Sequence, residues 1–108
     1  MIFAQFYGSD ALYSGLRPTL ERRIADVLRA RPEDVVLRRM PMESHYPGLE
    51  VWVELSSEEQ LAQYGRDIAQ AVTASVRDES QDDVWVLFSI VPLSHVFLNG
   101  EPRRRGAA

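Results

Sequence analysis

Two histidines and a set of arginines are the side chains of this sequence that could do chemistry near neutral pH. The 108-residue chain has 12 basic residues, all arginine, 16 acidic residues and no cysteine. Without lysine there is no Schiff-base or P-loop chemistry, and without cysteine there is no thiol nucleophile or thiolate metal site. The inventory names no cofactor, and two histidines with carboxylates at no ligand spacing predict no metal site.

His45 and His95 are the candidates for proton transfer, because histidine titrates near neutral pH. They follow two strand-like segments at similar positions, which suggests a pair of equivalent loops. A loop histidine that caps backbone groups is the simpler interpretation, and both interpretations stay open at this point.

The net charge indicates which classes of partner to expect. The formal net charge is −4, whereas nucleic-acid-binding domains are usually basic. The single basic run is Arg103–Arg105, and we interpret residues 101–108 as a flexible, arginine-rich C-terminal tail. No apolar stretch approaches the ~20 residues of a membrane helix, and the N-terminus lacks the pattern of a signal peptide. We therefore expect a cytoplasmic protein with neither a nucleic-acid nor a membrane partner.

Four strand-like segments and two helical segments must position these side chains. Strands are predicted over residues 2–7, 34–40, 49–55 and 83–91, and the last is so continuously apolar that we expect it in the middle of a covered sheet. The first helix carries apolar residues from Leu16 to Leu28, with Pro18 in its first turn. The second starts with a capping box from Ser56 to Glu59.

The order of these segments is β-α-β-β-α-β, in two halves of about equal length. A helix between two strands predicts a right-handed crossover with parallel strands. We therefore expect an α+β fold with pseudo-two-fold symmetry, in which a four-stranded mixed sheet has two helices on one face. The other face, with Trp52 and Trp85, would be bare, and an exposed apolar sheet face normally marks an assembly surface.

Three motifs indicate a family. They are Tyr46-Pro47-Gly48-Leu49-Glu50-Val51, Asp83-Val84-Trp85-Val86-Leu87-Phe88 and Asn99-Gly100. Together with the order of the elements, they resemble the tautomerase superfamily, which includes macrophage migration inhibitory factor and 4-oxalocrotonate tautomerase, and within it an uncharacterised bacterial branch. The resemblance covers residues 1–100, which we interpret as a single tautomerase-like domain. It implies a homotrimer with sites between neighbouring subunits.

The chemistry of that family depends on an N-terminal proline that is exposed when the initiator methionine is removed. In an apolar pocket this secondary amine has a lowered pKa and acts as a general base. Here Ile2 stands in the place of the proline, and a bulky residue at this position should keep Met1 in place. The resemblance therefore implies a protein without proline-dependent tautomerase activity.

Other site positions carry over from the resemblance. Arg31 matches a substrate-holding lysine, whereas Trp85 and Leu87 match a pocket tyrosine and a pocket asparagine and lose their polar groups. Some members place substrate-binding arginines in the second strand, where Arg38 and Arg39 lie; adjacent residues of a strand point to opposite faces, so one of the two can reach a site. These positions imply an apolar ligand site with a cationic wall.

Three functions remain open at this point. The first is a homotrimeric protein that binds a small carboxylate or keto acid at a subunit interface. The second is a keto-enol isomerase that uses a base other than proline, namely the Met1 amine, His45 or His95. The third is a structural or regulatory module whose interface is its function.

Overall fold

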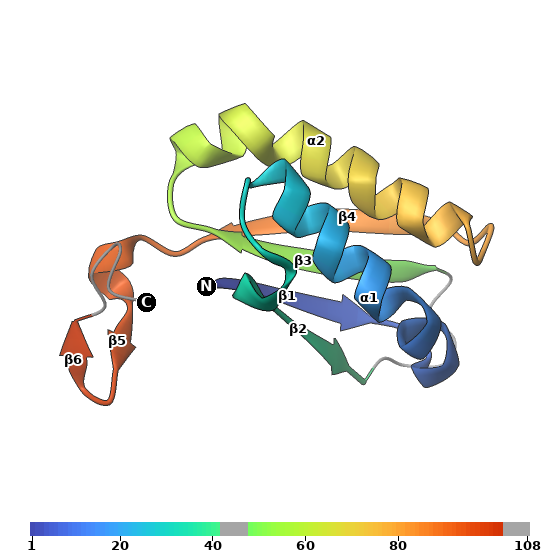
Figure 1. Ribbon diagram of the computed structural model, residues 1–108, viewed down its shortest axis with the longest axis horizontal. Coiled ribbons are helices and arrows are strands. Elements are labelled where there is room, and N and C mark those ends of the chain that lie inside the picture. The colour runs from blue at the N-terminus through green and yellow to red at the C-terminus, as the bar shows by residue number, and fades with distance from the viewer. Residues whose placement is uncertain (42–47, 103–108) are drawn as a thin grey trace.

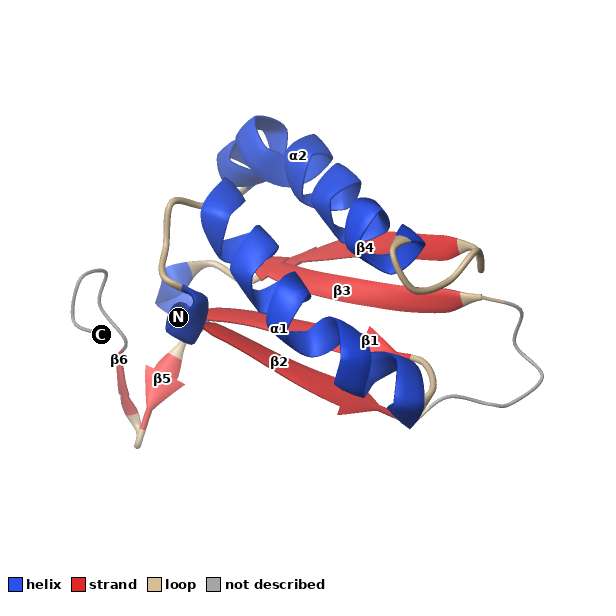
Figure 2. Ribbon diagram, turned by 45° about the vertical axis from the view of Figure 1, so that its right-hand side comes forward, coloured by secondary structure: helices blue, strands red, loops and turns tan. Residues whose placement is uncertain are grey.

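The computed structural model describes residues 1–41 and 48–102. The elements of the main body are, in chain order, β1 (Ile2–Tyr7), α1 (Asp10–Val27), β2 (Val35–Met40), β3 (Leu49–Leu55), α2 (Glu58–Arg77) and β4 (Val84–Ile90). Two short strands follow, β5 (Phe97–Leu98) and β6 (Glu101–Pro102). Single 3-10 turns, Pro32–Asp34 and Leu93–His95, precede β2 and β5. Both helices lie across one face of the four-stranded sheet (Figures 1 and 2).

The sheet has the strand order β2-β1-β3-β4. Strand β1 pairs with β2 in parallel, β3 pairs with β4 in parallel, and the central pair β1–β3 is antiparallel. Each half of the chain is therefore one β-α-β unit, and the two units meet antiparallel at the centre of the sheet. The predicted α+β fold, with a mixed sheet and two helices on one face, is confirmed.

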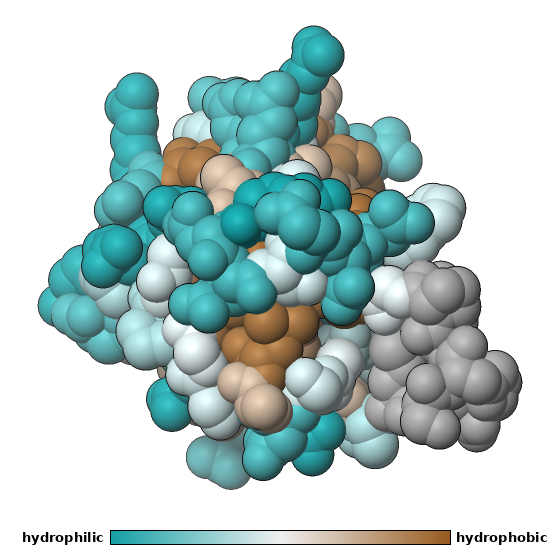
Figure 3. Space-filling view, turned by 90° about the vertical axis from the view of Figure 1, so that its right-hand side faces the viewer, coloured by the Kyte–Doolittle hydropathy of each residue, from teal (hydrophilic) through white to brown (hydrophobic). Residues whose placement is uncertain are grey.

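Alternation along the central strands decides which side chains form the core. Strand β3 alternates buried and half-buried residues over its whole length, and Ala4 and Phe6 are the buried residues of β1. Strand β2 adds Val35 and Leu37. Most of the remaining apolar core comes from the helices, mainly Leu16, Leu20, Ile24, Ile68, Val72 and Val76. Burying one such aliphatic side chain contributes about 1.5–3 kcal/mol, so tertiary packing and not helix propensity stabilises α1 and α2. At the end of the molecule opposite β5 and β6, a small hydrophobic area shows between hydrophilic side chains (Figure 3).

Helix α1 begins earlier than the sequence pattern predicts. Its N-cap is Ser9, whose Oγ accepts a hydrogen bond from the Leu12 N–H at 3.2 Å. Pro18 therefore lies inside the helix, and its predicted place in the first turn is wrong. Proline lacks an N–H, so the carbonyl four residues earlier has no helical partner. Pro18 is exposed, which leaves that carbonyl on the side where water can bond to it.

Helix α2 begins one residue later than predicted. Its N-cap is Ser57, which accepts a hydrogen bond from the Gln60 N–H at 3.1 Å. The Gln60 side chain in turn accepts a bond from the backbone N–H of Ser56 at 2.8 Å. The predicted box from Ser56 to Glu59 is thus wrong by one position. Glu58 and Glu59 lie in the first turn, where their charges interact favourably with the helix dipole.

Strand β4 corrects a third expectation. Its apolar sequence predicts a strand in the middle of a covered sheet, but β4 is an edge strand, and its Trp85 side chain is 56% exposed. Most of its other side chains are half-buried. The two faces of a strand can both be apolar without central placement if something outside this chain covers one of them.

The last two strands form a separate hairpin. Asn99 and Gly100 have φ values of 54° and 81°, which suits the two-residue reversal that the sequence predicts. Phe97 and Leu98 are exposed, and the hairpin stands away from the four-stranded sheet (Figure 1). Within the described part of the chain, neither helix is long and apolar enough to cross a membrane.

Candidate functional site

The face of the sheet away from the helices carries a pocket of about 240 Å³. It lies over β1, β2 and β3, and it is lined by Phe3, Ala4, Gln5, Val36, Arg38 and Glu54. The parallel register pairs Phe3 with Val36 and Gln5 with Arg38, so these four side chains stand on one face in two adjacent rows. Pockets for drug-sized molecules measure about 300–1,000 Å³, so this one suits a smaller ligand. We refer to it as the open-face pocket.

Arg38 supplies the positive charge of the open-face pocket. Its Cζ lies 5.9 Å from the centroid of the Phe3 ring, within the range of a cation–π contact. Among residues 1–41 and 48–102, no carboxylate lies within ion-pair distance of its guanidinium. Within this part of the chain, no carboxylate occupies the guanidinium donors of Arg38, and they are therefore available to a bound anion.

Glu54 supplies a negative charge on another wall of the same pocket. It is half-buried on β3, and no arginine of the described ranges forms an ion pair with it. The open-face pocket thus combines a guanidinium, a carboxylate, an aromatic ring and the Gln5 amide.

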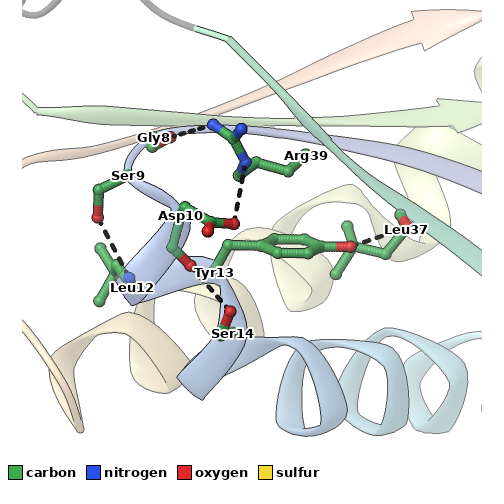
Figure 4. Close-up of polar contacts among 8 residues, drawn as sticks. All are labelled: Gly8, Ser9, Asp10, Leu12, Tyr13, Ser14, Leu37 and Arg39. Atoms are coloured by element: carbon green, nitrogen blue, oxygen red, sulfur yellow. Dashed lines mark hydrogen bonds and ion pairs between the residues drawn. The ribbon is translucent and has the colours of Figure 1, made fainter.

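Arg39 points to the other side of the sheet, as the alternation predicts. Its Nε lies 3.4 Å from Asp10 Oδ1, and its Nη1 donates to the Gly8 carbonyl at 3.5 Å (Figure 4). Beside it, the Tyr13 hydroxyl donates to the Leu37 carbonyl at 3.0 Å (Figure 4). Arg39 therefore ties the start of α1 to the end of β2, and only Arg38 of the two arginines reaches the pocket.

Arg31 lies outside the open-face pocket, just before β2. Its side chain is 75% exposed, with Nη2 3.6 Å from Asp34 Oδ1 and Nε 3.8 Å from Glu33 Oε1. These two carboxylates are exposed ion-pair partners of Arg31. A role for Arg31 in holding a ligand stays a prediction, and it would require a ligand that displaces them.

Asp34 contacts Arg31 and lies within the electrostatic range of the N-terminus. The hydrogen bond from the Arg31 N–H lowers the pKa of Asp34 from its ordinary value of 3.8, and the Arg31 side chain and the Met1 ammonium lower it further. Because the pKa of Asp34 is depressed in the folded state, its charged form stabilises the fold above pH 3.8, and this contribution is lost as the pH falls through the lowered pKa.

We expect Asp34→Asn to lower the unfolding midpoint slightly at pH 7 and to leave it unchanged near pH 2, where the wild-type carboxylate is also protonated. Thermal unfolding between pH 2 and pH 7 measures the difference between the two proteins. Asp67→Asn is the control, because Asp67 is exposed on α2 and forms no hydrogen bond or ion pair with the rest of the described chain. A difference between wild type and Asp34→Asn that grew towards low pH would contradict this assignment.

The residues at the very N-terminus do not line the open-face pocket. Ile2, which the resemblance matches to the catalytic proline, is in register with Val35 and packs against the core on the helix side. Met1 is 67% exposed, and its amine acts on Asp34. The first residue of the chain that does reach the pocket is Phe3.

Trp85 and Leu87 stand on the open face of β4, away from the pocket. Their partners in register on β3 are Glu50 and Trp52, and the Trp52 Nε1 donates to Glu50 at 3.0 Å. Arg38 and Leu87 belong to the same row across the sheet, but they lie at its two opposite edges. A single chain therefore does not bring the predicted ligand-binding residues Arg31, Arg38, Trp85 and Leu87 together.

His95 does not line the open-face pocket. His95 is exposed in the 3-10 turn before β5, and its backbone N–H donates to the Pro92 carbonyl at 2.8 Å. His45 lies outside the described residues, so its proposed role stays a prediction. In the ranges that the structure covers, no three His, Asp or Glu side chains gather closely enough to hold a metal ion.

Of the lining residues, Arg38 was predicted from the sequence as a ligand-binding residue, whereas Phe3, Ala4, Gln5 and Glu54 were not. Side chains alternate between the two faces of the sheet along β1 and β2. This alternation could have placed Phe3 on the same face as Arg38. Glu54 had no such signal, since its place depends on how β3 pairs with β1.

Comparison with known proteins identifies solved structures with a similar fold. The chain matches no protein-family profile and no curated protein sequence. Among solved structures, it is similar to a protein of unknown function from Vibrio cholerae, with 18% identity, a TM-score of 0.80, and coverage of 94% of this chain and 87% of that one. Macrophage migration inhibitory factor of Toxoplasma gondii matches with 14% identity and a TM-score of 0.65, over 90% of this chain and 96% of that chain.

A third similar structure is the fused wild-type 4-OT asymmetric trimer. It shares 16% identity and a TM-score of 0.58, over 93% of this chain and 94% of that chain. At such low sequence identities, the similarities show the fold alone. They agree with the topology described above and with the resemblance that the sequence motifs carry, and the chain therefore has the fold of the tautomerase superfamily.

Proposed function

We propose that this chain forms a cytoplasmic homotrimer that lacks proline-dependent tautomerase activity and binds a small carboxylate or keto acid at a subunit interface. The observation that carries the proposal is Arg38, whose guanidinium stands over the Phe3 ring in the open-face pocket with no ion-pair partner among the described residues. Arginine binds a carboxylate through two parallel hydrogen bonds. Phe3 and Val36 supply apolar contacts for the rest of a small ligand, and the Gln5 amide can bond to a keto oxygen.

The open face and the β4 edge support the assembly. Strand β4 is apolar on both faces yet lies at the edge of the sheet, and Trp85 and Leu87 are on the face without helices. In a head-to-tail ring, the β4 edge of one subunit adjoins the β2 edge of the next. Trp85 and Leu87 then approach Arg38 of the neighbouring copy, which would unite the residues that a single chain keeps apart. The fused 4-OT structure is a trimer, which favours three copies over another number.

Arg38→Gln tests the binding site. We expect it to weaken pyruvate binding about 10- to 100-fold, because a hydrogen bond to a charged group contributes about 1.5–3 kcal/mol. Isothermal titration calorimetry or NMR titration measures the affinity. Arg39→Gln is the matched control: it removes the same group one residue away, on the other face of β2, and should leave the affinity unchanged. Equal binding by wild type and Arg38→Gln would overturn the proposed site.

The proposed homotrimer and the proposed lack of proline-dependent tautomerase activity are tested separately. Light scattering should report a particle three times the 12.3 kDa of one chain, and a monomer would contradict the proposed assembly. Phenylpyruvate should not be converted to its tautomer at rates above the background reaction. Conversion that disappears after acetylation of the N-terminus would instead favour an isomerase that uses the Met1 amine. Conversion lost in His95→Ala or His45→Ala would identify a histidine base.

A further inference from the structure

We propose that the open-face pocket selects small zwitterions, in particular α-amino acids with a compact side chain, over carboxylates of the same size. The role of Arg38 as the carboxylate partner rests on the proposed function. The new element is Glu54, which we assign to the ammonium group of the ligand.

The register of three strands brings the two charges toward one point. Strand β1 lies between β2 and β3, so Arg38 and Glu54 approach the pocket from opposite sides. The antiparallel register that pairs Ala4 with Val53 places Glu54 opposite Phe3. Arg38 leans over the same phenyl ring, at 5.9 Å. Both charged groups therefore flank the space above Phe3. Their backbones are separated by two strand spacings of about 4.8 Å and are also offset along the strands, because Arg38 pairs with Gln5 and Glu54 stands opposite Phe3.

This arrangement distinguishes a zwitterion from a simple anion. A carboxylate bound to Arg38 without a positive charge beside it brings a like charge close to the Glu54 carboxylate, which opposes binding. An α-amino acid carries its ammonium one carbon away from the carboxylate, so each of its charges meets the opposite charge on the protein.

Size restricts the ligand further. The pocket measures about 240 Å³, which is below the usual range for drug-sized ligands. An amino acid with a short side chain fits this space, and the apolar contacts available to that side chain come from Phe3 and Val36. A long charged side chain has no partner in the lining.

Alanine and pyruvate make the test direct, because the two molecules differ mainly in an ammonium group against a keto oxygen. We expect the wild-type protein to bind alanine about 10-fold or more tightly than pyruvate in NMR or calorimetric titrations. Glu54→Gln should remove this preference by weakening alanine and should leave pyruvate binding equal or stronger. Arg38→Gln should weaken both ligands.

Glu50→Gln is the matched control. Glu50 lies on the same strand and the same face as Glu54, but it accepts a hydrogen bond from Trp52 and does not line the pocket, so its replacement should change neither affinity. Wild-type protein that binds pyruvate as tightly as alanine would overturn the zwitterion proposal and leave the carboxylate site standing. Wild-type protein that binds neither ligand would overturn both. If Glu54→Gln fails to fold, the comparison of alanine with pyruvate on the wild-type protein still tests the proposal. Glu54→Asp keeps the charge and should retain the preference for alanine.

Discussion

Phe6→Ala is expected to cost about 3–5 kcal/mol of unfolding free energy, the usual range for emptying a buried phenylalanine site. Phe6 has no exposed surface, and its ring centroid lies 5.5 Å from that of Tyr13. A Cβ on Gly8 would come within 2.7 Å of the Phe6 ring, so the ring fills the space right up to the backbone after β1. Small domains have a total stability of about 5–15 kcal/mol, and this loss would consume a large part of it. Urea unfolding followed by tryptophan fluorescence measures the change.

Phe3→Ala is the matched control for Phe6. Both residues belong to β1, but Phe3 is half-buried on the open face. We expect a loss of about 1 kcal/mol or less in the isolated chain, as for most partly exposed positions. Any additional loss should depend on protein concentration, because subunit association stabilises the fold by mass action. Equal, concentration-independent losses for the two variants would contradict the assignment of the two faces.

Gly48→Ala is expected to destabilise the fold by about 2–4 kcal/mol, through a backbone conformation that L-residues avoid and through a lost hydrogen bond. Gly48 has a φ of 112°, and a Cβ there would lie 2.8 Å from the Asp83 carbonyl oxygen. That oxygen accepts the backbone hydrogen bond from Leu49 at 2.9 Å, which joins the start of β3 to the start of β4. The added methyl group would therefore separate the two strands where their pairing begins.

Gly100→Ala separates the two causes. Gly100 also has a positive φ, 81°, but no atom of residues 1–41 and 48–102 lies within 4 Å of a Cβ placed there. Its replacement should cost only the backbone strain, about 1 kcal/mol. Chemical denaturation of both variants checks the difference, and a Gly48 variant no less stable than the Gly100 variant would show that the close approach to Asp83 is unimportant.

Much of the fold follows from patterns that are local in the sequence. The alternation of apolar and polar residues in β3 and the helical spacing in α2 report which face of each element is buried, because side-chain direction repeats every two residues in a strand and about every 3.6 in a helix. The same rule separated Arg38 from Arg39. Asn99-Gly100 indicated the hairpin, because both positions accept a positive φ.

The helix boundaries were less predictable. In α1, Leu12 and Tyr13 continue the apolar stripe towards Ser9 and pack against the core. Pro18 nevertheless favoured a later start, because proline is common in the first turn of a helix. The start of α2 offers two serines in a row, and only the three-dimensional path of the chain shows that Ser57 caps the helix. Boundary signals of this kind depend on single hydrogen bonds, whereas the existence of a helix depends on many buried side chains.

The place of β4 and the composition of the candidate site needed the tertiary structure. A run of apolar residues is the same whether a strand is covered by its own chain or by another, so the sequence could not distinguish a central β4 from an edge strand at an interface. In the same way, Glu54 comes to Phe3 only because β1 and β3 pair antiparallel in one particular register.

Local periodicity and turn chemistry were thus sufficient for the elements, their buried faces and the β-α-β units of this protein, because those features depend on neighbours within a few residues. The juxtaposition of Arg38, Phe3 and Glu54 was decided by strand pairing across the whole chain. Such pairing is the sum of many weak, non-local contacts, and a shift of a single residue in register would turn Glu54 away from the pocket.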